Sequence, residues 1–387
     1  MVSVAFAASA LASFTAAVPA PHEDRFPETK LSNGLRFPLV GLGCSSGVRT
    51  NHVLSALKLG YRHLDTAQAY QWGYHEDEVG VAVKESGVPR NELFIQSKIF
   101  PEDLGFAATK RAVEVSLQRL QLAYLDSMLI HKPHCWEGAC SKKPEGTWQD
   151  SWRSLQELYR AGKVHAIGIC DVDGVLMDSL VEQDVKPHII QNWMDPFHQD
   201  KEIRERCLAE GIQYQGYSTL GPQWVHFRGF SDNPVLTNPT LNAIARAHSA
   251  TVPQVVLNWA TRQGVAVIPA SKQESRQRAN LNSFFFDLSQ SEVEAIDSLD
   301  GSLEKSNVHE GPTSLQIRFR NSGPKDLQVF WVNPSGTEVH NGDIPSGGDM
   351  NLQSYDGHRF AFRGIDGSLV HSHVVKSNED GDEVHIL

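Results

Sequence analysis

The segment GYRHLDTAQAY, residues 60–70, decides the fold prediction. It follows an amphipathic helical pattern and opens with a short run, Tyr61–Asp65, that ends in a carboxylate. A short run of this kind after a helical pattern is typical of a buried strand in an alternating α/β fold. We therefore predict a strand over Tyr61–Asp65, with Asp65 at its C-terminal end.

Seven further short apolar runs repeat this rhythm along the chain. Patterns such as ATKRAVEVSLQRLQ, with apolar residues three and four apart, separate them and predict helices. Eight strand–helix alternations over roughly 270 residues predict an α/β protein with a closed (β/α)8 barrel, the TIM-barrel fold. The other predicted strands are Leu39–Gly43, Leu93–Lys98, Leu125–His131, Ala166–Cys170, His188–Asn192, Gln213–Tyr217 and Ala266–Ile268.

A doubly wound open sheet is the alternative architecture. It would place a phosphate-binding loop after its first strand, and GLGCSSG at residues 41–47 superficially resembles one. The glycine spacing does not match GxGxxG, however, so we prefer the barrel.

After Asp300 the sequence changes character. A polar stretch is followed by short alternating runs that Gly, Pro, Asn and Asp separate, which predicts a small all-β sandwich with an acidic tail. The predicted domains are an N-terminal extension at 1–28, the barrel at 29–301, a linker at 302–311 and the sandwich at 312–387.

Composition limits the class of protein. The 387 residues are 40% hydrophobic and 21% charged, as in a soluble globular protein, and we expect a monomer without a membrane span. The net charge of −11 argues against a nucleic-acid partner. Residues 1–21 carry no charge and resemble a secretory or organelle-targeting signal, although the basic start is missing. An unstructured extension of a cytoplasmic protein is the alternative.

The five cysteines, odd in number and scattered, imply no disulfide framework. Cys135 and Cys140 are close enough to pair or to help bind a metal ion. No CxxC spacing supports a zinc site, so we predict two free thiols and no metal.

Polar residues fall at the ends of the predicted strands. Asp65, Lys98 and His131 end the second, third and fourth strands, and Tyr70 lies five residues past Asp65. In a barrel these ends converge on one mouth. A carbonyl that accepts hydride needs a proton, and an ammonium group held by a carboxylate lowers the pKa of a neighbouring phenol, which otherwise is near 10. An imidazole can orient the carbonyl.

Over residues 30–301 the sequence resembles the aldo-keto reductase family. The resemblance implies NADPH-dependent reduction of an aldehyde or ketone to an alcohol by hydride transfer. It implies that Tyr70 donates the proton, that Lys98 and Asp65 tune it, and that His131 orients the substrate. The matching motifs are GYRHLDTAQAY, IQSKI, LDSMLIHKP, ELYRAGKVHAIGI and VIPAS-x4-R-x3-N.

The resemblance also implies the contacts of the cofactor, NADPH or NADP⁺. A guanidinium at the adenosine 2′-phosphate favours NADPH over NADH. The implied contacts are Cys170, Asp171 and Gln191 at the carboxamide, Tyr217 on the nicotinamide ring, Ser218 and Leu220 at the pyrophosphate, Ser271 and Arg276 at the 2′-phosphate, and Asn280 at the adenine.

Several positions depart from the family pattern. Asp171 replaces an amide, so it cannot donate a hydrogen bond, and its charge should favour the oxidised nicotinamide. Ala270 replaces a lysine, and the loop after Tyr70, QWGYHEDEVG, is a few residues longer than usual. The aromatic residues expected in the substrate pocket are replaced by Ser45, Phe100 and Lys132.

Residues 312–375 resemble the β-domain of the von Hippel–Lindau family through VFWVNPSGTEV and SYDGHRFAFRG. That resemblance implies a hydroxyproline-containing peptide partner bound by Trp331, Ser354 and His358. Packing is the alternative role for Trp331, and no segment matches the elongin-binding helices. A second hypothesis for the whole chain is therefore an NADP(H)-binding sensor or adaptor whose C-terminal domain binds a peptide.

Overall fold

The structure is a computed structural model that describes residues 26–135, 140–303, 315–332, 338–354, 359–375 and 383–386. By their contacts the residues form two units, one ending at Ser302 and one beginning at Leu303. The predicted targeting segment and most of the predicted linker lie outside the described residues. Among the helices that the structure describes, none is long and apolar enough to cross a membrane.

The first unit is the predicted (β/α)8 barrel. Its eight strands pair in parallel in chain order, and bridges from Val40 to Val267 and from Gly43 to Ala270 join the first strand to the last. The strands are β3 (Leu42–Gly43), β4 (His63–Asp65), β5 (Phe94–Ile99), β6 (Ser127–Ile130), β7 (Ile167–Cys170), β8 (Ile189–Trp193), β9 (Gln213–Tyr217) and β10 (Ala266–Val267).

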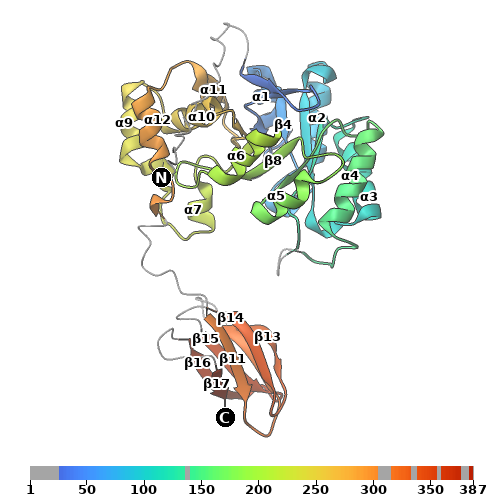
Figure 1. The fold of residues 1–387 in the computed structure, drawn as a ribbon, viewed down its shortest axis with the longest axis vertical. Coiled ribbons are helices and arrows are strands. Elements are labelled where there is room, and N and C mark those ends of the chain that lie inside the picture. Colours follow the sequence, from blue (N-terminus) through green and yellow to red (C-terminus); the bar gives the residue numbers. More distant parts are fainter. Residues whose placement is uncertain are drawn as a thin grey trace, which may run out of the picture. The chain divides into compact units, whose positions relative to one another are not determined.

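Helices surround the strands (Figure 1). Capping boxes at Thr147, Thr251 and Ser289 fix the starts of three of them, α4, α10 and α12. Their bounds are α1 (Thr50–Leu59), α2 (Glu76–Glu85), α3 (Phe106–Leu120), α4 (Trp148–Arg160), α5 (Gly174–Val181), α6 (Lys201–Glu210), α7 (Pro222–His226), α8 (Pro234–Thr237), α9 (Pro239–Ala247), α10 (Val252–Arg262), α11 (Glu274–Leu281) and α12 (Gln290–Asp297).

A β-hairpin covers the N-terminal end of the barrel. Its strands β1 (Glu28–Lys30) and β2 (Arg36–Pro38) are antiparallel, and the dipeptide Asn33-Gly34, which is typical of a tight turn, lies between them. Phe37 is fully buried and packs edge-on against Phe94 at the start of β5. The polar residues lie at the opposite end of the barrel, the mouth formed by the C-terminal ends of the strands.

The C-terminal unit is all β, as predicted. One sheet has the order β14-β11-β17 and the other β13-β12-β15-β16, and a phenylalanine core of Phe319, Phe360 and Phe362 joins them. The sequence did not predict β13 or β17. The strands are β11 (Leu315–Asn321), β12 (Leu327–Val332), β13 (Glu338–Ile344), β14 (Asp349–Ser354), β15 (Arg359–Gly364), β16 (Leu369–Val374) and β17 (Glu383–Ile386).

The first prediction concerns Gly168 in β7. A Cβ atom there would lie 2.3 Å from the carbonyl oxygen of Ile189, so Gly168→Ala should lower the free energy of unfolding of the barrel by about 1–3 kcal/mol. Urea unfolding of the barrel transition measures this change. In the control Gly174→Ala, the new Cβ would meet only the flexible side-chain ends of Glu202 and Arg206, so stability should hardly change. Equal stability of the two variants would contradict the prediction.

Candidate active site

A buried ion pair lies at the centre of the barrel mouth. Lys98 Nζ donates to Asp65 Oδ2 at 2.6 Å and to the carbonyl oxygen of Thr66 at 3.1 Å, and both charged side chains are 0–1% exposed. The strands β4 and β5 are neighbours, so their C-terminal ends bring the two residues together. Burial alone would lower the pKa of Lys98, but Asp65, Tyr74 and Cys170 together outweigh burial and raise the pKa above its usual value. Lys98 therefore stays charged.

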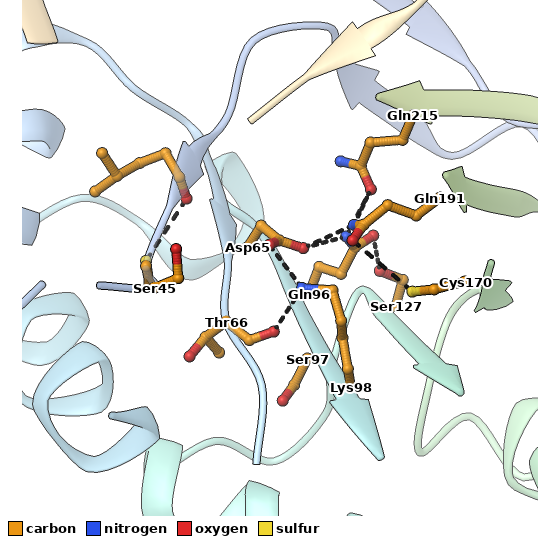
Figure 2. A network of polar contacts seen from close by, with 12 residues as sticks. Ser45, Asp65, Thr66, Gln96, Ser97, Lys98, Ser127, Cys170, Gln191 and Gln215 are labelled. Atoms are coloured by element: carbon orange, nitrogen blue, oxygen red, sulfur yellow. Dashed lines mark hydrogen bonds and ion pairs between the residues drawn. The ribbon is translucent and has the colours of Figure 1, made fainter. Parts of the chain in front are cut away.

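A layer of glutamines supports Asp65 from inside the barrel (Figure 2). Asp65 Oδ1 accepts from Gln96 Nε2 at 2.5 Å and from Gln191 Nε2 at 3.1 Å. Both amides also donate to Gln215 Oε1, at 2.7 and 2.8 Å. The structure thus places Gln191, predicted at the carboxamide, in the layer that holds Asp65. Sequence reasoning missed Gln96 and Gln215, although a glutamine within an apolar strand is a readable signal.

His131 follows β6 and is buried at the mouth. Burial and the nearby cations of Lys98 and Lys132 hold its pKa well below the usual range, so the ring is neutral at physiological pH. Its Nδ1 has no hydrogen-bond partner among the residues that the structure describes. A neutral imidazole here can orient a carbonyl group without competing as the acid.

Tyr70 does not join this group. It starts a short 3-10 helix, η1 (Tyr70–Trp72), where its hydroxyl donates to Asp77 Oδ1 at 2.8 Å and its ring faces the Arg119 guanidinium 4.9 Å away. Partial burial and the bond to Asp77 raise the pKa of Tyr70 to about 12.

Tyr74, four residues later, occupies the place expected for Tyr70. Lys98 Nζ lies 5.1 Å from the centre of the Tyr74 ring, and the His131 ring centre is 5.8 Å away. Burial raises the pKa of Tyr74 to about 12, while the charge of Lys98 acts to lower it. The structure therefore brings Tyr74 together with Asp65, Lys98 and His131. One feature of the sequence could have indicated Tyr74: it is a second tyrosine, placed just before the acidic residues that begin α2.

The same loop supplies an aromatic wall. Trp72 packs edge-on against His131 and Phe100, with ring centres 4.9 and 5.3 Å apart. The main-chain nitrogens of Ser46 and Gly47 donate to the carbonyl oxygens of Trp72 and Gly73, at 3.4 and 3.0 Å.

Of the predicted pocket residues, Phe100 lies at this wall. Ser45 lies beside the two residues that bind the Trp72 loop, and Lys132 contacts Asp171 instead. Sequence reasoning missed Trp72.

The residues predicted at the nicotinamide end lie together beyond strands β7 and β9. The Tyr217 hydroxyl donates to Asp171 Oδ1 at 2.8 Å, and Lys132 forms a short ion pair with Asp171. Cys170 is buried beside them, and its thiol faces Gln191 Oε1 at 3.8 Å. These groups border the space next to Lys98.

The residues predicted at the pyrophosphate and adenosine end are more dispersed. Ser218 Oγ accepts from Gln223, and the Leu220 carbonyl oxygen accepts from Asn233. Ser271 is nearly buried at the start of the segment that leads into α11. Arg276 lies exposed on α11, and the buried side chain of Asn280 contacts the Tyr61 hydroxyl.

The cysteines correct one prediction. Cys135 and Cys140 form a disulfide, with Cα atoms 5.9 Å apart, rather than two free thiols. A separation of five residues lets the loop after β6 fold back far enough for the bond. Cys44, Cys170 and Cys207 are buried and free. Within the described ranges, no group of three or more His, Cys, Asp or Glu residues could hold a metal ion.

The predicted peptide pocket of the C-terminal unit is only partly described. Trp331 on β12 stands opposite Phe360 of β15 and packs against the core of the unit. Ser354 ends β14, and its side chain lies outside the described part, as does all of His358. Binding of hydroxyproline stays a prediction.

Comparison with known proteins identifies the barrel. Residues 48–301 match the aldo/keto reductase family. The glyoxal reductase of Bacillus subtilis is 38% identical over 276 residues, which cover 70% of this chain and 92% of that protein. The morphine 6-dehydrogenase of Pseudomonas putida is 33% identical, covering 71% and 91%.

Solved structures agree. The Brucella melitensis aldo/keto reductase superposes with a TM-score of 0.62 at 31% identity, covering 71% of this chain and all of that one. The Bombyx mori aldo-keto reductase in complex with NADP gives 0.65 at 28% identity, covering 72% and 94%. The cofactor is accordingly a nicotinamide dinucleotide. This chain belongs to the aldo/keto reductase family.

Proposed function

We propose that this protein reduces an aldehyde or ketone to an alcohol, with hydride from NADPH and a proton from Tyr74. The observation that carries the proposal is the position of Tyr74 beside the buried Lys98–Asp65 pair and His131. A reduction of this kind needs a hydride for the carbonyl carbon and a proton for its oxygen. The nicotinamide supplies the first when bound, and the chain supplies the second.

Four residues have separate roles in the proposed proton transfer. The Tyr74 hydroxyl transfers its proton to the carbonyl oxygen as the alcohol forms, which leaves a phenolate that water reprotonates. The fixed charge of Lys98 favours that phenolate, because an adjacent cation stabilises the anionic form. Asp65 keeps Lys98 charged and in place inside the barrel. The neutral His131 positions the carbonyl oxygen for the transfer.

The surroundings of Tyr70 suit it less well to this role. Its hydroxyl already donates to Asp77, and a carboxylate beside a phenol opposes formation of the phenolate. We therefore assign Tyr70 to the loop, where it ties η1 to the start of α2. Trp72 and Phe100 form the apolar side of the proposed substrate pocket.

The second prediction separates the two tyrosines. Tyr74→Phe should reduce kcat for NADPH-dependent reduction of a panel of aldehydes and ketones by about 10²–10⁴-fold, because the positioned acid is lost. The dissociation constant for NADPH should hardly change. Tyr70→Phe is the matched control and should keep turnover within about threefold of the wild type, since it loses one partly exposed hydrogen bond.

The opposite pattern would assign the proton donor to Tyr70. Binding of NADPH without turnover of any carbonyl compound by the wild type would favour the sensor or adaptor hypothesis.

A preference for NADPH over NADH is part of the proposal. Arg276 is exposed on α11, and the structure shows no ion pair or hydrogen bond from its guanidinium to any described residue. The next arginine along the helix, Arg278, pairs with Glu274 at 2.9 Å. A guanidinium without a partner among the described residues, on the helix that follows Ser271, supports contact with a 2′-phosphate, which NADH lacks.

The third prediction tests this contact. Arg276→Ala should weaken NADPH binding by about 10–100-fold and leave NADH binding nearly unchanged, since a charge-assisted hydrogen bond is lost only when the phosphate is present. Calorimetric titration with both cofactors measures this difference. Arg278→Ala removes an exposed arginine of the same helix and should affect neither. Equal weakening of both cofactors by Arg276→Ala would place it outside the phosphate site.

A further inference from the structure

Three side chains at the barrel mouth form a linked set: Lys132, Asp171 and Tyr217. Asp171 accepts from the Tyr217 hydroxyl at 2.8 Å through Oδ1 and pairs with Lys132 through Oδ2. The Lys132 ammonium also lies 5.8 Å from the centre of the Tyr217 ring. The two charged side chains are about one quarter exposed, at 25% and 27%.

In the proposed reductase site, this set borders the place where hydride transfer would occur. Lys132 directly follows His131, Asp171 follows Cys170 at the end of β7, and Tyr217 ends β9. Burial and the charge of Lys98 lower the pKa of His131, and the charge of Lys132 adds to this effect. After burial, Asp171 is the largest cause of the raised pKa of Tyr217, and Tyr74 also contributes. Lys132 therefore acts on His131, and Asp171 acts on Tyr217.

The hydride donor changes its charge during the reaction. A nicotinamide ring is neutral when reduced and carries a positive charge when oxidised. An isolated carboxylate near the ring would stabilise the oxidised form, whereas an isolated ammonium would oppose it. When a carboxylate and an ammonium are in contact, their electrostatic effects on a third, more distant group largely cancel.

We infer that Lys132 sets the balance between the oxidised and reduced cofactor by neutralising Asp171. This role is distinct from substrate binding, the role suggested for Lys132 by the sequence, and it rests on the proposed reductase site. Tyr217 joins the pair through its hydroxyl, so the same carboxylate that carries the charge also fixes the ring at the mouth. The pair thereby takes the place of a neutral amide.

The backbone makes Asp171 suitable for a clean substitution. Its φ of 55° lies in the left-handed region, which Asp and Asn tolerate better than other residues with a Cβ atom. Asp171→Asn therefore removes the charge at little conformational cost. Lys132→Met removes the opposite charge and keeps a side chain of similar length.

The experiment measures the dissociation constants of NADPH and NADP⁺ by calorimetry for the full chain and its variants. Lys132→Met should raise the ratio Kd(NADPH)/Kd(NADP⁺) by about three- to tenfold, because Asp171 is left unpaired. Asp171→Asn should lower the same ratio by a similar factor. The double variant should return to within about twofold of the wild type. Lys132→Arg keeps the charge and should also keep the ratio.

Lys186→Met removes a surface lysine paired with Glu210 and serves as the control for a general effect of lost charge. It should leave the ratio unchanged. An unchanged Kd ratio in both single variants, or equal shifts of the ratio in the same direction, would overturn the inference. If NADPH still binds in that case, the reductase proposal is unaffected. Failure of the wild type to bind either cofactor would contradict the proposed function itself.

Discussion

The ion pair between Lys98 and Asp65 is the constraint around which the barrel mouth is built. Two charges without access to water are costly unless each is hydrogen-bonded as well as paired. Asp65 meets this requirement through two glutamine amides, and Lys98 through the carbonyl oxygen of Thr66. The polar layer inside an otherwise apolar barrel follows from that need. The same hydrogen bonds and ion pair also hold the Lys98 cation in a fixed position beside Tyr74.

The parts of the site that lie on strands could be predicted from the sequence. Asp65, Lys98 and His131 each end an apolar run. The C-terminal ends of parallel barrel strands all lie at one mouth, independently of the length of the intervening helices. The barrel itself was predictable for the same reason.

The parts that lie on loops could not be predicted in the same way. Tyr70 and Tyr74 are four residues apart, and the number of residues in a loop does not reveal which side chain turns inward. The contact between Lys132 and Asp171 joins positions 39 apart in the chain, and only the packing of β6 beside β7 brings them together. The strand β13, with the sequence EVHNGDI, has too few apolar residues to show the alternation expected of a strand. It pairs with the neighbouring strand β12, a contact that its own sequence does not indicate.

The attachment of the loop that carries Tyr74 has a consequence for folding. The carbonyl groups of Trp72 and Gly73 bind main-chain nitrogens just after β3, and β3 is where the first strand meets the last. Contacts between the two ends of a barrel close the largest loops in the chain and form late. Because the loop is attached beside this seam, we expect its position at the mouth to become fixed when the ring of strands closes. Recovery of turnover during refolding would report ring closure, not the earlier formation of individual strand–helix units.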